Sequence, residues 1–437
     1  MRVLCVIGSR PEIIKMAPVI EEFVEEELWI IHTGQHYDYL MSMSFIEELG
    51  LPGIDKNLEV GSGTHAYQTS SMIIGLERIF NEFKPDVVIA EGDTNSVVAT
   101  SLTCSKLLLP FAHVESGLRS FDMTMPEEVN RILADHCSEL LFAPTEISAL
   151  NLIDENVSPS KIFITGNTIV DACKKNLSLA LKKRTYDNLD LDDFILMTLH
   201  RAENVDDKER LKEAIEGLKS IDCEIVFPVH PRTEKRLKEF NLYKDLVDSN
   251  ITMIKPLGYL DFLNLLYHCK FVMTDSGGIQ EEAIILKKPC LTLRENTERP
   301  ETVMLGANIL VGIDKERMKK YANLLLDSEE FYKKMTNVEN PYGDGTSGEK
   351  IAKIIREKFE KGELKIKRPD FRDELPFRKF MKLGDRHDNK SVEEIEEEEN
   401  IEIMLIIDEA GVKYFPRKDF ILKRGSIVDY RRRWKIC

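Results

Sequence analysis

The sequence predicts an α/β protein made of two doubly wound domains that face each other across a cleft. Apolar strand-like runs alternate with amphipathic helical stretches from residue 2 almost to residue 361, a pattern typical of parallel sheets with helices on both faces. The chain has 437 residues, more than a single hydrophobic core usually serves. A short C-terminal appendage of different composition follows these two domains.

Twelve candidate strands fall into two sets separated by Lys182–Asn188, which is polar and has no periodicity. We therefore predict Rossmann-like domains over residues 1–183 and 187–345. A helical pattern over 346–361 is expected to close the second domain or to pack back on the first. The candidate strands are 2–7, 28–32, 87–90, 111–114, 140–143 and 162–165, then 194–199, 224–228, 251–254, 270–274, 289–292 and 308–311.

Residues 362–437 form the appendage, and the sequence assigns no chemistry to them. The run Glu393–Glu399, interrupted only by Ile395, is most simply a solvated acidic linker. Strand-like pieces at 401–407 and 411–415 follow it, and then a basic end at Arg431–Arg433. We expect an acidic linker and a small module of unknown role.

The composition excludes several classes of partner. The net charge of −16 argues against a nucleic-acid binder of the basic-patch kind. No apolar run reaches the length of a membrane span, and no signal-like leader follows Met1, so we expect a cytoplasmic protein with no membrane partner. The eight cysteines lack a C-x-x-C pair and are interpreted as reduced core residues, while the spacing of His32 and His36 falls on a loop. We predict no metal site.

The first strand runs directly into a turn and a helix start that favour an anion. Gly8 permits a sharp turn, Ser9 suits an N-cap, and Pro11 is preset for a first helical turn. Arg10 and Lys15 then lie near a helix N-terminus, where cations and unpaired N–H groups bind a phosphate or pyrophosphate. The alternative is an ordinary Rossmann-like turn whose two cations are merely solvated.

Polar side chains follow strand after strand, at the carboxyl ends where ligands of parallel sheets bind. Asp93 and Glu115 are candidates for acid–base chemistry because of this position. Glu127 has a complete alternative explanation as an acidic residue in the first turn of a helix. The turn Ser276-Gly277-Gly278 and the helix after it suit a phosphate. The alternative is simply a tight turn at a helix start. Glu281 and Glu282 either reach a ribose or remain solvated.

A match to the dinucleotide fingerprint, Gly61-Ser62-Gly63-Thr64-His65-Ala66, lies outside the first strand–helix turn and lacks the acid that should close the next strand. We therefore expect no nicotinamide cofactor, and no other cofactor either.

Seven motifs in a fixed order give the chain a close resemblance to the non-hydrolysing UDP-N-acetylglucosamine 2-epimerases, over about residues 1–361. The resemblance implies two Rossmann-like domains of the glycosyltransferase-B type, and an expected homodimer. The motifs are Gly8–Lys15, Thr33–His36, Gly92–Ser96, His113–Arg119, Pro126–Arg131, Gly166–Asp171 and Thr274–Glu282.

The resemblance also implies a reaction and its residues. Such enzymes eliminate UDP across C1–C2 of UDP-N-acetylglucosamine to give 2-acetamidoglucal, and then add UDP back after reprotonation on the other face, giving UDP-N-acetylmannosamine. Asp93, Glu115 and Glu127 would be the acid–base carboxylates, with Arg131 orienting them and His200 near the diphosphate. The residues expected to hold UDP are Arg10, Lys15, His200, His230, Ser276, Gly277, Gly278 and Glu282.

Some positions depart from the family pattern. Of the residues that bind a second, activating substrate molecule in bacterial members, Gln68 remains, but the stretch Tyr37–Ser42 lacks the glutamines. Arg294–Glu301 matches a family loop expected near the uridine.

The alternatives to this function are a 2-epimerase of a modified sugar such as UDP-2,3-diacetamido-glucuronate, a hydrolysing 2-epimerase, and a non-catalytic nucleotide-sugar sensor.

Overall fold

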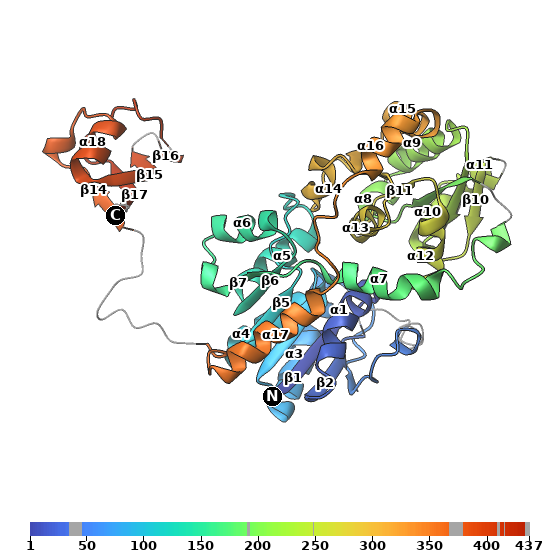
Figure 1. Ribbon diagram of the computed structural model, residues 1–437, viewed down its shortest axis with the longest axis horizontal. Coiled ribbons are helices and arrows are strands. Elements are labelled where there is room, and N and C mark those ends of the chain that lie inside the picture. Colours follow the sequence, from blue (N-terminus) through green and yellow to red (C-terminus); the bar gives the residue numbers. More distant parts are fainter. Residues whose placement is uncertain are drawn as a thin grey trace. The chain divides into compact units, whose positions relative to one another are not determined.

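The computed structural model describes residues 1–34, 46–189, 193–247, 249–366, 379–408, 411–414 and 416–432. The chain divides into two compact units, Met1–Ile366 and Lys367–Cys437, which are described separately (Figure 1). His36 and the stretch Tyr37–Ser42, on which two of the sequence expectations depend, lie outside the described residues.

The first sheet of the larger unit has seven parallel strands in the order β3-β2-β1-β4-β5-β6-β7. The strand order reverses between β1 and β4. In open parallel sheets, ligands bind at the loops that follow the strands at such a point. The strands are β1 (Arg2–Ile7), β2 (Glu27–His32), β3 (Lys56–Asn57), β4 (Val87–Glu91), β5 (Phe111–Val114), β6 (Leu140–Ala143) and β7 (Ile162–Ile164). The helices are α1 (Arg10–Glu22), α3 (His65–Phe83), α4 (Asn95–Leu107), α5 (Pro126–His136), α6 (Glu146–Asp154) and α7 (Thr168–Ala180).

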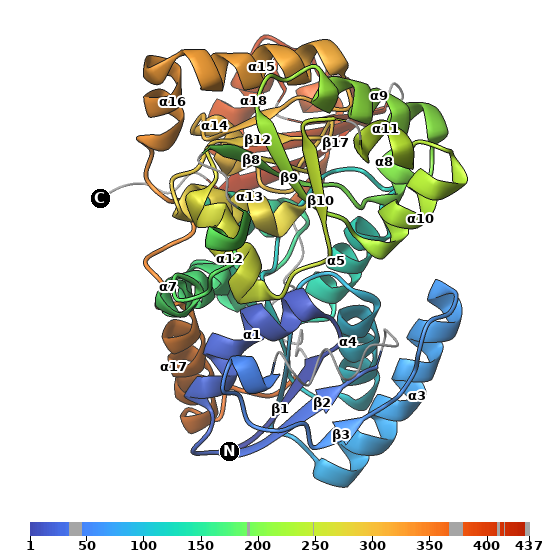
Figure 2. The same cartoon turned by 90° about the vertical axis from the view of Figure 1, so that its right-hand side faces the viewer.

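The second sheet has six parallel strands in the order β10-β9-β8-β11-β12-β13. The two doubly wound sheets of the predicted α/β fold are thus confirmed (Figures 1 and 2). The strands are β8 (Phe194–Thr198), β9 (Glu224–Pro228), β10 (Ile251–Ile254), β11 (Val272–Thr274), β12 (Cys290–Thr292) and β13 (Asn308–Leu310). The helices are α8 (Ala202–Val205), α9 (Lys208–Lys219), α10 (Pro231–Glu239), α11 (Tyr243–Val247), α12 (Tyr259–His268), α13 (Gly277–Ile285), α14 (Pro300–Met304), α15 (Lys315–Asp327) and α16 (Glu329–Thr336).

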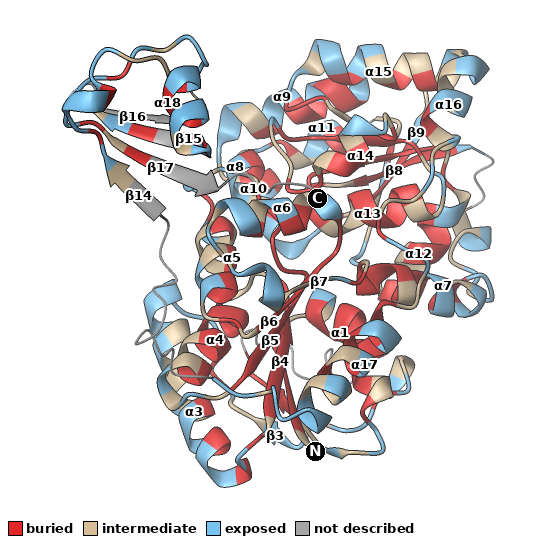
Figure 3. Cartoon of the chain, turned by 60° about the vertical axis from the view of Figure 1, so that its left-hand side comes forward, coloured by how far each residue is buried: buried red, intermediate tan, exposed pale blue. Residues whose placement is uncertain are grey.

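The central strands of both sheets are buried along almost their whole length, because helices cover both faces (Figure 3). β4 and β8 illustrate this: every residue of β4 is buried, and only the last residue of β8 is partly exposed. Polar side chains therefore gather in the loops beyond the strands. No helix among the described residues is long and apolar enough to cross a membrane.

The helix that follows the second sheet, α17 (Ser347–Glu360), packs on α1 and α7 of the first domain. Of the two placements left open by the sequence, the structure shows the return to the first domain (Figure 1). Ile351, Ala352 and Ile355 are the buried residues that join the core there. Near its start, Gly348 lies so close to α1 that a Cβ atom would come 2.5 Å from the carbonyl oxygen of Pro18.

The described residues of the smaller unit include an antiparallel sheet in the order β14-β17-β15-β16 and the α-helix α18 (Val392–Glu399). The strands are β14 (Lys379–Lys382), β15 (Ile401–Asp408), β16 (Gly411–Tyr414) and β17 (Ile427–Arg432). The expectation that Glu393–Glu399 is a solvated linker is wrong, because these residues form most of α18.

The physical reason is the spacing of the few apolar residues in that run. Val392 and Ile395, three residues apart, lie on one face of α18 and are both fully buried in the core of this unit. Glu396 is buried as well and accepts a hydrogen bond of 2.8 Å from the backbone N–H of Ile403. Ser391 and Glu394 complete a capping box at the helix start.

We predict that Gly348→Ala lowers the free energy of unfolding by about 2 kcal/mol, although alanine is the better helix former. The added methyl group meets backbone, which cannot rotate away. Urea denaturation of the variant measures the change. Lys353→Ala, at an exposed position of the same helix, is the control and should change the value by less than about 0.5 kcal/mol. A Gly348→Ala protein as stable as the parent would contradict this packing.

Candidate active site

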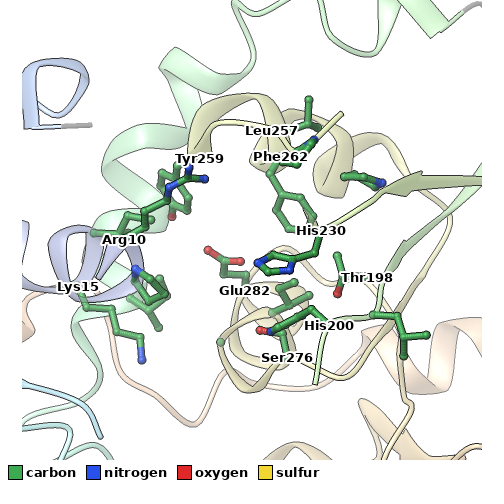
Figure 4. Close-up of a pocket in the computed structure, with 18 residues that line it drawn as sticks. Arg10, Lys15, Thr198, His200, His230, Leu257, Tyr259, Phe262, Ser276 and Glu282 are labelled. Carbon is green, nitrogen blue, oxygen red and sulfur yellow. The ribbon is translucent and has the colours of Figure 1, made fainter. Parts of the chain in front are cut away.

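A cavity of about 270 Å³ lies between the carboxyl ends of the two sheets and is lined from both domains. The first domain contributes the start of α1 and part of α7, and the second contributes the loops after β8, β9, β10 and β11 (Figure 4). The lining residues are Arg10, Pro11, Ile14, Lys15, Ile169, Thr198, Leu199, His200, Pro228, His230, Pro256, Leu257, Tyr259, Phe262, Ser276, Gly278, Ile279 and Glu282.

One part of the cavity suits an anion. Arg10 is the first residue of α1, and Ser276 is the N-cap of α13, so two helix starts from different domains meet here. Gly278 lines the cavity, and a Cβ atom there would meet nothing within 4 Å. Gly277 does not line it, because its missing side chain makes room for Glu298 and Arg299 instead. The structure thus separates the roles of the two glycines.

Another part combines a carboxylate with apolar walls. Glu282 lines the cavity beside Tyr259, Phe262 and Leu257 (Figure 4). Burial and the neighbouring Glu281 carboxylate raise the pKa of Glu282 to about 7. A carboxyl group next to aromatic and aliphatic side chains suits a ribose hydroxyl beside a flat base.

Two histidines lie between these parts, with ring centroids 5.7 Å apart. Nδ1 of His200 lies 3.1 Å from Oδ1 of the buried Asp275, which also accepts hydrogen bonds from the backbone N–H groups of His200 and Arg201. Burial disfavours the charged form of Asp275, but His200 and these bonds outweigh it and lower its pKa to about 2. Burial and the nearby His200 lower the pKa of His230.

Lys15 is placed differently from what the sequence suggested. Its stem lines the cavity, but its ammonium group extends away from Glu282 and His230 (Figure 4) and contacts Glu115, with Glu91 at 3.2 Å. Burial opposes the charge of Lys15, but these two carboxylates outweigh it and raise its pKa. In this structure the cation therefore neutralises buried carboxylates.

Glu115 is the residue on which cations from both domains converge. Besides Lys15, it accepts hydrogen bonds from Arg299 Nη2 at 2.9 Å and from Asn167 Nδ2 at 2.8 Å. Burial disfavours its charge, but Lys15 and Arg299 outweigh it and lower the pKa of Glu115 to about 2. Arg299 also lies 3.3 Å from Glu281 of its own domain, and its bond to Glu115 joins the two domains.

The other candidate carboxylates lie around Arg131. The guanidinium of Arg131 contacts Asp93 and lies 2.7 Å from Glu128, so it holds Asp93 in a fixed position. Glu127 is 40% exposed and lies 3.9 Å from Arg201 of the second domain. Because Arg201 directly follows His200, this group adjoins the cavity without lining it.

The predicted residues therefore form two neighbouring groups. Arg10, Lys15, His200, His230, Ser276, Gly278 and Glu282 line the cavity. Asp93, Glu115, Glu127 and Arg131 lie beside it. Within the part of the chain that the structure describes, no group of three His, Cys, Asp or Glu side chains is arranged to hold a metal ion.

Comparison with known proteins identifies the family. The family model described as UDP-N-acetylglucosamine 2-epimerase matches residues 20–356. The chain belongs to the UDP-N-acetylglucosamine 2-epimerase family. It is 52% identical over 367 residues to the UDP-N-acetylglucosamine 2-epimerase of Methanocaldococcus jannaschii, which covers 81% of this chain and 99% of that relative.

A solved structure and one further relative of this epimerase family bear on the site. The crystal structure of the M. jannaschii enzyme in complex with UDP-GlcNAc and UDP matches with a TM-score of 0.77 and 51% identity, over 82% of this chain and 100% of that one. The UDP-2,3-diacetamido-2,3-dideoxy-D-glucuronate 2-epimerase of Pseudomonas aeruginosa is 39% identical over 366 residues, 81% of this chain and 99% of the relative. The smaller unit lies beyond the residues that the family model matches.

Sequence reasoning assigned no role to three charged residues of the site. Arg201 and Arg299 contact Glu127 and Glu115 of the other domain, and Glu298 contacts both arginines. Nothing in their spacing shows these contacts. The sequence signal for Arg299 is the proline that follows it. Pro300 suits the first turn of a helix, which makes Arg299 the N-cap residue.

The loop Arg294–Glu301 does not line the cavity, and Asn296 Nδ2 donates to Asp122 of the first domain at 3.2 Å. Its expected place near the uridine stays a prediction.

Glu12 is a further missed residue and connects two loops of the site. It accepts hydrogen bonds from the backbone N–H groups of Gly8 and Ser9, and from the hydroxyl of Thr94, the residue after Asp93. Its position three residues after Ser9 predicts the capping box but not the bond to Thr94. Burial raises the pKa of Glu12 to about 7, against the effect of these three hydrogen bonds.

We predict that Glu12→Gln removes a pH dependence of stability. A carboxyl group whose pKa rises on folding stabilises the protein below its unfolded pKa of 4.5, and this contribution is lost as the pH rises through about 7. Glutamine accepts from Gly8 and Ser9 and donates to Thr94 at every pH. The variant should therefore match the parent near pH 4.5 and exceed it at pH 8, by about 3 kcal/mol at most.

Urea unfolding of both proteins across this pH range measures the difference. Other buried carboxyl groups are common to the two proteins, so their contributions cancel. A difference between the two proteins that does not change with pH would contradict the assignment.

Proposed function

We propose that this chain interconverts UDP-N-acetylglucosamine and UDP-N-acetylmannosamine by reversible inversion at C2, without hydrolysis. The observation that carries the proposal is one cavity with an anion-binding part formed from both domains, a carboxylate beside apolar walls, and acidic residues next to it. The family and the M. jannaschii complex with UDP-GlcNAc and UDP support it.

The first half of the reaction is an elimination. A carboxylate removes the C2 proton, the C1–C2 double bond forms, and the bond between C1 and the phosphate oxygen breaks, which releases UDP and 2-acetamidoglucal. Arg10 and the N-terminus of α13 suit the negative charge that develops on the diphosphate. Glu282 suits the ribose.

The second half reverses these steps on the other face of the sugar. A carboxyl group delivers a proton to C2, and UDP adds back to C1. Two carboxyl groups in opposite protonation states are therefore required. Asp93, Glu115 and Glu127 are the proposed acid–base residues, with Arg131 holding Asp93 and His200 placed near the diphosphate.

Keeping 2-acetamidoglucal and UDP in the site favours epimerisation over hydrolysis. The side chains of Lys15, Glu115, Glu281 and Arg299 are at most 8% exposed, so the domains meet there with little access for water. Excluding water keeps the glucal and UDP available for the return step. No cofactor is required for this chemistry. We further propose a cytoplasmic homodimer.

The modified-sugar alternative is supported by the 39% identical P. aeruginosa relative, but the 52% identical M. jannaschii relative favours the unmodified sugar.

We predict that incubation with UDP-N-acetylglucosamine in heavy water gives UDP-N-acetylmannosamine with deuterium at C2, observed by proton NMR. Free N-acetylmannosamine would indicate the hydrolysing alternative, and no change would indicate a sensor. Turnover of the diacetamido-glucuronate derivative alone would refute the substrate but not the mechanism.

We predict that Asp93→Asn lowers the rate of C2 exchange by about 100-fold or more, because an amide neither takes nor gives this proton. Its affinity for UDP, measured by calorimetry, should change little, since Asp93 does not line the cavity. Asp154→Asn, at the exposed end of α6, is the matched control with unchanged exchange. Full activity of Asp93→Asn would remove Asp93 from the acid–base residues.

A further inference from the structure

A fully buried histidine–aspartate pair lies beneath the proposed acid–base residues and belongs to none of the groups described above. His113 on β5 and Asp135 on α5 have no exposed side-chain surface. Nδ1 of His113 lies 2.7 Å from Oδ1 of Asp135, and Nε2 lies 2.8 Å from the carbonyl oxygen of Gly92.

The chemistry of one partner fixes the direction of the Nε2 hydrogen bond. A backbone carbonyl only accepts hydrogen bonds, so Nε2 must donate to Gly92. Asp135 also accepts from the Arg119 guanidinium at 2.8 Å and from the backbone N–H of Gly117 at 3.2 Å. Burial disfavours its charge, but His113 and Arg119 outweigh it and lower the pKa of Asp135. His113 and Asp135 therefore connect the Gly92 carbonyl to the Gly117 N–H through buried hydrogen bonds.

The backbone atoms held by this pair belong to the two loops that carry proposed acid–base residues. Gly92 directly precedes Asp93, and Gly117 is two residues after Glu115. The loops need such support, because Gly92, Glu115 and Gly117 all have positive φ, at 88°, 67° and 81°. For Glu115 this conformation is strained, and a strained residue persists only where its surroundings fix it.

We propose that His113 and Asp135 are positioning residues of the epimerisation, a buried hydrogen-bonded pair that sets the separation of Asp93 and Glu115 by binding the loop of each. This inference rests on the proposed function. Asn130 supports the same arrangement, since its Nδ2 donates to the carbonyl oxygen of Asp93 at 2.9 Å. Neither His113 nor Asp135 touches the cavity that would hold UDP.

The kinetic test uses His113→Phe, which removes both ring nitrogens, and His113→Gln, which keeps one donor near the Nε2 position. We expect His113→Phe to lower kcat by about 100-fold, since a misplacement of about 1 Å has that effect, while KM and the Kd for UDP stay within about 3-fold. His113→Gln should recover about tenfold of the loss. Phe142→Leu, a buried truncation on the neighbouring strand β6, is the control, with kcat unchanged.

Three kinetic outcomes would overturn the proposal: an unchanged kcat in folded His113→Phe, a loss of kcat matched by an equal loss of UDP affinity, or the same loss of kcat in Phe142→Leu. If His113→Phe does not fold, His113→Gln carries the same comparison with a smaller expected loss.

Nitrogen-15 NMR of the parent protein supplies a test that needs no turnover. We expect Nε2 of His113 to bear a proton and to donate it to the Gly92 carbonyl oxygen, and an Nε2 without a proton would overturn the proposal. Absence of UDP-N-acetylglucosamine turnover in the parent protein would refute the proposed function, whereas normal parent turnover with unaffected His113 variants would refute this inference alone.

Discussion

The site depends above all on the buried ionic contacts of Glu115. Lys15 from α1 and Arg299 from the start of α14 both reach this carboxylate, so cations from the two domains meet on one residue of the first. Removing either cation would leave an uncompensated charge in a buried place, which is strongly unfavourable. The relative placement of the two sheets, and with it the shape of the cavity, follows from this constraint.

The same contacts bring several buried carboxyl groups together. Glu91, Glu115, Glu281 and Glu298 face Lys15 and Arg299, and Glu298 also contacts Arg294. Burial raises the pKa of Glu281 to about 7, although Arg299 opposes this, and burial raises the pKa of Glu91 well above its usual value, although Lys15 opposes this. A substrate diphosphate that enters beside Lys15 adds further negative charge. The protonation of this network is therefore tied to the occupancy of the cavity.

Much of the fold was predictable because its signals are local. Strands buried on both faces appear as continuous apolar runs, and the carboxyl ends of parallel strands meet at one edge, which brought Arg10, His200 and Ser276 together correctly. Partners across the two domains were not predictable: nothing near Lys15 in the sequence points to Glu115, 100 residues later. The helix α18 was missed because its six glutamates obscured the spacing of Val392 and Ile395.

The central claim is that UDP leaves the sugar, stays bound between the two domains and returns. The most direct test is positional isotope exchange, with oxygen-18 placed in the bond between C1 and the β-phosphate of UDP-N-acetylglucosamine. If the bond breaks and the held diphosphate rotates before it returns, the label appears in non-bridging positions of recovered substrate, as seen by phosphorus-31 NMR. Epimerisation at C2 with the label still wholly in the bridge would contradict the account.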